Sequence, residues 1–176
     1  MDPSSQFEPG MFESEGPIAE DFPAIEIVDG SMEEYLPSSR ELFREYGSWG
    51  DAVPCFTSLD AELQRLPGEY APPEGRLLLA RSGSASAGMV SLRPLSESRC
   101  EMKRLWVRPE FRGQGVGMLL VKTLLQEARE IGYSEMVLDT LPVMKSAQRI
   151  YREFGFGECE SYYDAPPTSI FMRLAL

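Results

Sequence analysis

The chain has 176 residues, which suits one domain with its own hydrophobic core, and 43% of the residues are hydrophobic. Its 28 acidic residues outnumber 17 basic ones and give a net charge of −11, which argues against nucleic acid as a partner because phosphate binding draws on Lys and Arg. The chain contains no His, which excludes His-based catalytic triads and the commonest zinc centres.

The first 22 residues are rich in Pro, Gly, Ser and Glu, and they carry six acidic side chains without any Lys or Arg. This composition is typical of a disordered or loosely attached segment. We therefore expect an acidic, flexible leader over residues 1–22 and a folded domain over residues 23–176.

Hydrophobic periodicity and turn residues predict short strands and helices along this domain. In chain order, the predicted elements are a strand over 24–28; helical turns over 32–46, capped by Ser31 and interrupted near Pro37; a loop over 47–56; a helix to Leu66, capped by Ser58 or Asp60; strands over 76–80 and 88–92, joined by a hairpin at Gly83; a strand over 100–107; a helix over 114–131, stopped by Gly132; a strand over 135–140; a helix over about 143–154, ended by Gly155; and closing strands over 156–163 and 169–175. Together they predict an α+β fold, with a mixed, mostly antiparallel sheet of about seven strands flanked by about four helices.

The junction between the strand over 100–107 and the helix over 114–131 contains the segment Arg112-Gly113-Gln114-Gly115-Val116-Gly117. The first turn of a helix leaves about four N–H groups without partners, and the aligned peptide dipoles add positive charge there. Gly allows positive φ and lets a ligand approach the backbone closely. The junction therefore favours a pyrophosphate ligand, and a Gly-rich turn that only connects strand and helix is the alternative.

The spacing of the glycines narrows the choice of ligand. A Walker loop needs Lys and then Ser or Thr after Gly117, where Met118 and Leu119 stand, and a dinucleotide fingerprint needs a third Gly at Met118. The pattern that remains, Arg-x-x-Gly-x-Gly, resembles the acetyl-coenzyme A (acetyl-CoA) motif of the GCN5-related N-acetyltransferase (GNAT) family.

Two further segments extend this resemblance. The first is Glu101-Met102-Lys103-Arg104-Leu105-Trp106-Val107, and the second is Ala147–Phe156, with the pattern Ala-x-x-x-Tyr-x-x-x-Gly-Phe. Three motifs in this order over about 55 residues make the whole domain resemble a complete N-acetyltransferase.

The resemblance implies that acetyl-CoA is the cosubstrate and that no metal is required. It implies that the pyrophosphate is bound by Arg112, Gly113, Gln114, Gly115, Val116 and Gly117, and the pantetheine arm by Leu105, Trp106 and Val107, where two strands splay apart in the family. Many members add an Asn to this contact. Here that position is Met144, so that either Lys145 or Ser146 substitutes or the contact is absent.

Glu101 is the candidate general base. A strand of period two puts Glu101, Lys103, Leu105 and Val107 on one face. In histone-type members of the family a Glu at this position takes the proton of the acceptor amine, often through water, and a protonated amine has no lone pair for attack on the thioester. The alternative is that Glu101 only orients the substrate or pairs with Lys103.

Tyr151 lies four residues after Ala147, on the same face of the predicted helix. The resemblance makes it the general acid that protonates the departing CoA thiolate or positions the thiol. A core aromatic residue with a satisfied hydroxyl is the alternative.

The acceptor site is expected in the loops around the strand opening, and its candidate residues are Trp49, Phe56, Tyr162 and Asp164, beside residues 141–143. Aromatic rings next to carboxylates suit a small amine with an apolar part, although each ring is also a candidate for the core. The segment Tyr162-Tyr163-Asp164 resembles a Tyr-Tyr-Asp-Asn-Pro segment of one bacterial subgroup. Ala165 replaces its Asn, so the preferred acceptor can differ.

The sequence therefore predicts an acetyl-CoA-dependent N-acetyltransferase that acetylates a small primary amine in a ternary complex. One alternative is a non-catalytic acyl-CoA sensor, in which Met144 and Ala165 mark a decayed acceptor site. The other is an enzyme that acetylates protein N-termini or lysines.

Location and partners follow from what the sequence lacks. No apolar run approaches the roughly 20 residues of a bilayer span, and no segment has the pattern of a signal peptide. Cys55, Cys100 and Cys159 are odd in number and show no Cys-x-x-Cys spacing, as free thiols in a reducing compartment would. We expect a cytoplasmic monomer or homodimer whose partners are acetyl-CoA and an amine, with no nucleic acid and no membrane.

Overall fold

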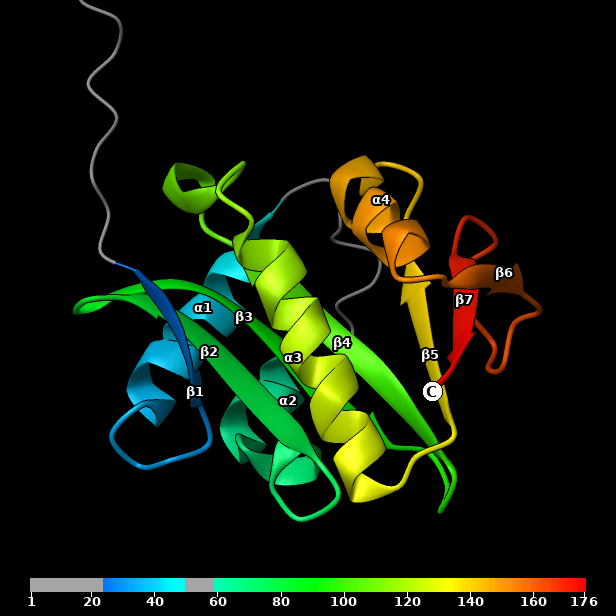
Figure 1. Ribbon diagram of the computed structural model, residues 1–176, viewed down its shortest axis with the longest axis horizontal. Coiled ribbons are helices and arrows are strands. Elements are labelled where there is room, and N and C mark those ends of the chain that lie inside the picture. Colours follow the sequence, from blue (N-terminus) through cyan, green and yellow to red (C-terminus); the bar gives the residue numbers. More distant parts are fainter. Residues whose placement is uncertain (1–23, 50–58) are drawn as a thin grey trace, which may run out of the picture.

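A computed structural model describes residues 24–49 and 59–176 (Figure 1); the predicted leader and the candidate residue Phe56 lie outside this part of the chain. Its strands form one sheet in the order β1-β2-β3-β4-β5-β7-β6, antiparallel throughout except for the parallel pair β4 and β5. The strands are β1 (Ile25–Asp29), β2 (Arg76–Ser82), β3 (Ala85–Pro94), β4 (Arg99–Val107), β5 (Glu135–Thr140), β6 (Gly157–Cys159) and β7 (Ile170–Ala175), and the α-helices are α1 (Leu36–Ser48), α2 (Leu59–Arg65), α3 (Val116–Ile131) and α4 (Lys145–Glu153). The predicted seven-stranded, mostly antiparallel sheet is confirmed.

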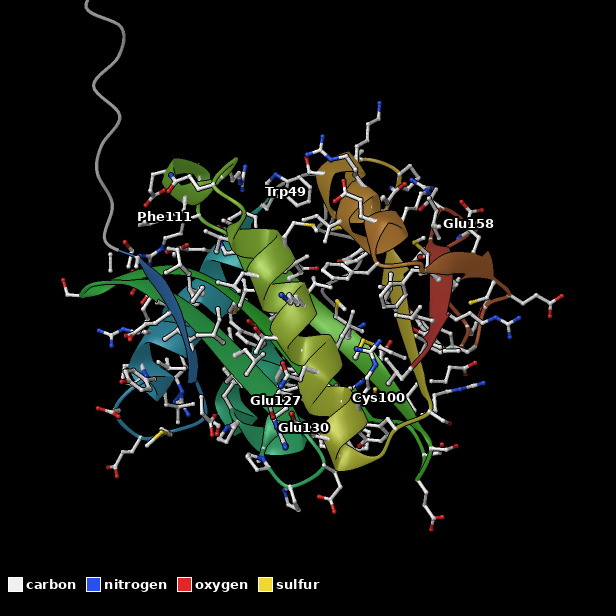
Figure 2. The ribbon with its side chains drawn as sticks, in the orientation of Figure 1. Trp49, Cys100, Phe111, Glu127, Glu130 and Glu158 are labelled. Atoms are coloured by element: carbon white, nitrogen blue, oxygen red, sulfur yellow. The ribbon has the colours of Figure 1, made fainter. Side chains whose placement is uncertain are left out.

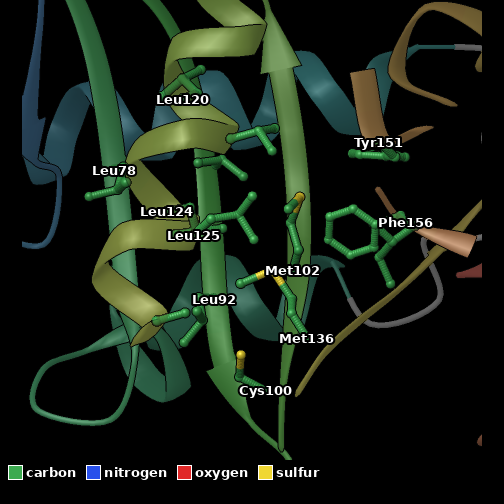
Figure 3. Close-up of a cluster of buried hydrophobic side chains, with 14 of the residues drawn as sticks. Leu78, Leu92, Cys100, Met102, Leu120, Leu124, Leu125, Met136, Tyr151 and Phe156 are labelled. Carbon is green, nitrogen blue, oxygen red and sulfur yellow. The ribbon is translucent and has the colours of Figure 1, made fainter. Parts of the chain in front are cut away.

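The helices cover both faces of the sheet, with α3 and α4 on one side and α1 and α2 on the other (Figure 1). The larger core cluster lies under α3, where Leu120 and Leu124 pack toward Met102 of β4 (Figure 3). Cys100 belongs to this cluster, and burial raises the pKa of its thiol to about 12, so it packs as a neutral group. No helix within residues 24–49 and 59–176 has the length and apolar character of a membrane span.

Three local predictions were wrong. Pro37 does not interrupt a helix but lies in the first turn of α1, where its missing N–H costs no hydrogen bond, and Ser31 binds Asp29 instead of capping that helix. The predicted strand over 156–163 is only the short β6, because the chain then leaves the sheet in a loop that returns at β7.

A β-bulge at Arg104 changes which side chains of β4 share a face. Trp106 pairs with Met89 and Lys103 pairs with Ser91, so two residues of β4 oppose one residue of β3. Arg104 has a φ of 59°, the left-handed conformation that such bulges use.

The predicted common face for Glu101, Lys103, Leu105 and Val107 was therefore wrong. Leu105 and Val107 pack on the α3 cluster, as Cys100 and Met102 do, while Glu101 and Lys103 point to the face that α1 and α2 cover. The bulge inserts one residue into the alternation, so the residues beyond it exchange faces.

We expect Glu62→Ala to destabilise the fold by about 3 kcal/mol, because it leaves a buried guanidinium uncompensated. The Arg104 side chain is 4% exposed and donates to Glu62 of α2 from Nε at 3.0 Å and from Nη2 at 2.5 Å. Urea unfolding followed by circular dichroism measures the change. The matched control is Glu153→Ala, which breaks an exposed pair with Arg149 and should cost less than about 0.5 kcal/mol. Equal losses in both variants would contradict a structural role for the buried pair.

Candidate active site

Strands β4 and β5 pair only at their beginnings. Arg99, Cys100 and Glu101 face residues 135–137, and beyond this point the two strands diverge, up to Val107 on β4 and Thr140 on β5. Figure 1 shows the resulting gap between the ribbons of β4 and β5, with α4 beside its open end. The edge of β4 that faces the gap at Leu105, Trp106 and Val107 thus has no strand partner, and an extended amide-containing chain can pair with it.

The segment before α3 folds as a turn that can bind an anion. Gly113 and Gly115 adopt φ values of 78° and 80°, which other residues adopt at a cost. A Cβ at either position would meet no atom within 4 Å, so packing does not explain the absence of a side chain. The first bond of the helix runs from the N–H of Leu119 to the carbonyl of Gly115 at 3.0 Å, so the N–H groups of the preceding turn have no helical acceptor.

Gly117 has a different role from the two glycines before it. A Cβ there would lie 2.9 Å from Cδ1 of Ile150, so Gly117 allows α3 to pack closely against α4. The pyrophosphate contact through its backbone N–H, in the first turn of α3, stays a prediction.

Arg112 is held at the end of β4. Its Nε donates to the carbonyl of Val107 at 3.0 Å, and its Cζ lies 5.0 Å from the centre of the Trp106 ring. Trp106 in turn packs on Trp49 at 6.3 Å and donates from Nε1 to Glu45. Figure 2 shows Trp49 at the same end of the molecule as Phe111, which precedes the turn. Trp49 and Arg112, two predicted site residues, therefore both contact the ring of Trp106, which is a third.

Tyr151 of α4 belongs to the buried cluster under α3, next to Phe156 (Figure 3). Its side chain is buried and its ring lies 5.9 Å from that of Phe156. Burial raises the pKa of the Tyr151 hydroxyl, and the nearby Tyr46 of α1 and Asp139 of β5 raise it further. Tyr46 belongs to the core cluster on the opposite face of the sheet, and Asp139 lies beyond the last pair of β5 with β4.

Glu101 lies on the other face, in a chain of alternating charges. Its carboxylate is fully buried and accepts from Nε of Arg93 at 2.6 Å on Oε2 and from the hydroxyl of Tyr162 at 2.7 Å on Oε1. The ammonium of Lys103 lies 3.5 Å from the same Oε1 and 2.8 Å from Asp139. Glu101, the candidate base, and Tyr162, a candidate acceptor contact, are therefore in direct contact although 61 residues separate them.

Asp139 is a site residue that the sequence analysis missed. Its side chain is 11% exposed near the end of β5, beyond the last pair with β4. Burial would raise the pKa of this carboxyl, but Lys103 and a hydrogen bond from Tyr163 outweigh burial and lower it, so Asp139 is anionic at neutral pH. Asp139 is one of three polar residues in the six-residue strand β5, so its position gave no distinct signal in the sequence.

The remaining predicted residues lie apart from these groups. Ser146 is exposed in the first turn of α4, and Met144 directs its sulfur to the Thr140 hydroxyl at 3.5 Å. Asp164 is exposed in the loop between β6 and β7. Both side chains are exposed, and their predicted contacts with the donor and the acceptor stay predictions.

Comparison with known proteins places these features in a wider group. Residues 36–156 match the model of the acetyltransferase (GNAT) family. An uncharacterised N-acetyltransferase of Schizosaccharomyces pombe is 45% identical over 155 residues, covering 86% of this chain and 95% of that protein. One of Dictyostelium discoideum is 30% identical over 215 residues, covering 86% and 99%.

The fold has a solved counterpart in the PaiA N-acetyltransferase of Thermoplasma acidophilum, which was crystallised in complex with coenzyme A. The two structures superpose with a TM-score of 0.68 over 87% of this chain and 99% of that one, at 20% sequence identity. At this identity the likeness concerns the fold alone.

Proposed function

The chain belongs to the GNAT family of acetyltransferases and is an acetyl-CoA-dependent acyltransferase, and from this membership we propose that it acetylates small primary amines. The amine attacks the thioester carbonyl directly while both substrates are bound. The gap between β4 and β5 is the observation that carries the proposal, because an anion-binding turn lies beside it and titratable groups flank it on both faces.

The donor would be bound mainly by backbone groups. The free N–H groups of the turn from Gly113 to Gly117 suit the diphosphate, and Arg112 adds a positive charge there. Beyond Glu101 this edge of β4 has no strand partner among the described residues, although Arg112 donates to the carbonyl of Val107. The edge suits the amide groups of the pantetheine arm, and one of its N–H groups can stabilise the thioester oxygen as it gains charge. Bound acetyl-CoA supplies an activated acetyl group.

The acceptor would enter from the face that carries Glu101 and Asp139. Negative and positive side chains alternate in a row from Glu69 through Arg93, Glu101 and Lys103 to Asp139. The last group of this row, which is nearest the open part of the gap, is therefore a carboxylate. A carboxylate attracts an ammonium group. The rings of Trp49, Trp106 and Tyr162 provide apolar surface for the rest of a small amine.

Two groups would handle protons during transfer. Glu101 would take up the proton that the ammonium must lose before attack, as the sequence suggested, although it is too deeply buried to touch the amine itself. Tyr151 would protonate the departing thiolate, and its raised pKa keeps the hydroxyl protonated for that purpose.

Thiol release from acetyl-CoA, measured with a panel of primary amines and with lysine-containing and free N-terminal peptides, tests the proposal. We expect at least one small amine to be acetylated with a kcat of at least about 1 per second. Preference for a peptide would identify a protein as the acceptor. Tight binding of acetyl-CoA without thiol release from any acceptor would identify a non-catalytic sensor and contradict the proposal.

The cellular setting is part of the same proposal. Cys100 and Cys159 are free thiols, which supports a reducing compartment such as the cytoplasm. The net charge of −11 supports partners other than nucleic acid. We propose a monomer or homodimer that acts without binding to a membrane.

A further inference from the structure

The carboxylate of Glu101 has no exposed surface and therefore cannot touch an acceptor in the gap. Arg93 occupies Oε2 at 2.6 Å, and the Tyr162 hydroxyl and the more distant Lys103 ammonium face Oε1. Arg93 and Lys103 are cations that only donate protons. The Tyr162 hydroxyl is therefore the one neighbour of Glu101, among the residues that the structure describes, that can accept a proton while donating another.

Tyr162 lies between Glu101 and open space. It comes from the loop between β6 and β7, its side chain is half-buried, and it lines a pocket of about 660 Å³ with Arg93, Tyr163 and, at the paired ends of β4 and β5, Arg99 and Glu135. Its ring packs edge-on against Tyr163 at 5.3 Å and against Phe171 at 5.1 Å. These two rings hold the hydroxyl in position, so that the hydrogen bond to Glu101 does not depend on a mobile side chain.

We propose that Tyr162 is a catalytic proton relay between the acceptor amine and Glu101, an inference that rests on the proposed amine acetylation. The ammonium N–H bond breaks and a new O–H bond forms on Tyr162, directly or through one water. In the same step the original O–H bond of Tyr162 breaks and its proton binds Oε1 of Glu101. The nitrogen keeps the electron pair and attacks the thioester, and the proton returns to solvent by the same route after the product leaves.

The charges around Tyr162 favour a concerted transfer. Burial raises the pKa of the Tyr162 hydroxyl, and the carboxylates of Glu101 and Asp139 raise it further, so the residue stays a phenol and no free tyrosinate forms. Tyr163 also raises this pKa.

The groups that face Glu101 from the neighbouring elements are Arg93 of β3, with Glu69 and Tyr70 beside it, and Lys103 of β4, with Asp139 of β5 beside it. The cations balance the carboxylates, so the proton moves within a cluster whose net charge changes little.

The test compares a basic acceptor with a weakly basic one. Phenethylamine is protonated at neutral pH, whereas two fluorines on the carbon next to its CH₂NH₂ group withdraw electrons, lower the pKa of the ammonium group and leave a much larger fraction of the amine neutral. The basic amine therefore depends far more on a relay. Tyr162→Phe should lower kcat for phenethylamine by about 100-fold near pH 7, with recovery toward pH 9, and should leave the rate with the fluorinated analogue nearly unchanged.

Two further variants keep the test specific. Glu101→Gln should change the ratio of kcat between the two amines as much as Tyr162→Phe does. The double variant should lose no more activity than either single variant, because both substitutions interrupt the same proton route. Tyr133→Phe, the same substitution at a tyrosine whose hydroxyl donates to the carbonyl of Glu74 instead of to the cluster around Glu101, should keep the wild-type ratio.

Three results separate the possible failures. Equal losses with both amines in Tyr162→Phe would make Tyr162 a structural residue and overturn the relay. If Tyr162→Phe leaves the ratio of kcat between the two amines as it is in the wild type, the relay is overturned as well. If the wild-type protein acetylates neither of these amines nor any other small primary amine of the panel although it binds acetyl-CoA, the proposed acceptor class fails and the relay fails with it.

Discussion

Gly115→Asp should lower the affinity for acetyl-CoA by at least about 100-fold, because it puts a negative charge where the diphosphate binds. Two like charges about 4 Å apart repel by about 4 kcal/mol at the effective dielectric constant near a protein surface. The fold should survive, since Asp tolerates the left-handed conformation of Gly115 and a Cβ there meets no atom within 4 Å. A carboxylate at the start of α3 also interacts favourably with the helix dipole. Isothermal titration calorimetry measures the loss.

Gly132→Asp is the matched control for this variant. Gly132 ends the same helix, has a φ of 107°, and would also place a Cβ in open space. The substitution brings the same change in charge but no contact with the turn before α3, so the affinity for acetyl-CoA should stay near that of the wild type. A similar loss of affinity in both variants would mean that the turn at Gly115 is not where the diphosphate binds.

Tyr151→Phe should lower kcat by about 100-fold while the affinity for CoA stays within about twofold of the wild type. The hydroxyl is the group lost, and a thiolate already leaves fairly well, so the reaction slows without stopping. Because burial raises the pKa of Tyr151, its hydroxyl remains protonated up to at least about pH 9. Up to that pH, the wild-type rate should therefore not fall through loss of the Tyr151 proton. Single-turnover kinetics with a saturating amine measure the acetyl transfer itself.

Tyr133→Phe is the control for a structural tyrosine. Tyr133 is also buried, and its hydroxyl donates to the carbonyl of Glu74 at 2.9 Å. Removing that bond should cost about 1 kcal/mol of stability and leave kcat unchanged. Tyr151→Phe should behave in the opposite way, with a large loss of kcat and little change in stability. If Tyr151→Phe weakens CoA binding as much as it slows the reaction, Tyr151 shapes the site and is not the acid.

The strong periodic segments were predictable because local sequence determines them. The apolar repeat of α3 with Gly132 at its end and the strand over residues 135–140 agree closely with the structure. The left-handed glycines before α3 were predictable for the same reason, since Gly113 and Gly115 are the residues that adopt positive φ most easily. The role of Gly117 was not, because its close contact is with Ile150 on a distant helix.

The bulge at Arg104 shows what a strand pattern cannot predict. Nothing in the residues 101–107 marks an extra residue, since Arg rarely adopts a positive φ and the partner that holds it, Glu62, is 42 residues away. The bulge sends Glu101 and Lys103 to one face and Leu105 and Val107 to the other. It therefore separates the candidate base from the strand end that would bind the pantetheine arm.

The partners of Glu101 were equally hidden from the sequence. Glu101 and Tyr162 were chosen separately, one as a base and the other as an acceptor contact, and their hydrogen bond depends on the loop that returns from β6 to β7. Arg93 and Asp139 belong to other strands and carry no motif. Long-range ion pairs of this kind arise from sheet order, which one sequence does not reveal.

The most direct test of this account is a crystal structure of the protein with acetyl-CoA. We predict that the diphosphate lies on the N–H groups of the turn from Gly113 to Gly117 and that the pantetheine arm pairs with Leu105–Val107 in the gap between β4 and β5. The thioester should then lie beside the hydroxyl of Tyr151. Acetyl-CoA bound elsewhere, with the turn empty and the gap closed by pairing of β4 and β5, would contradict it.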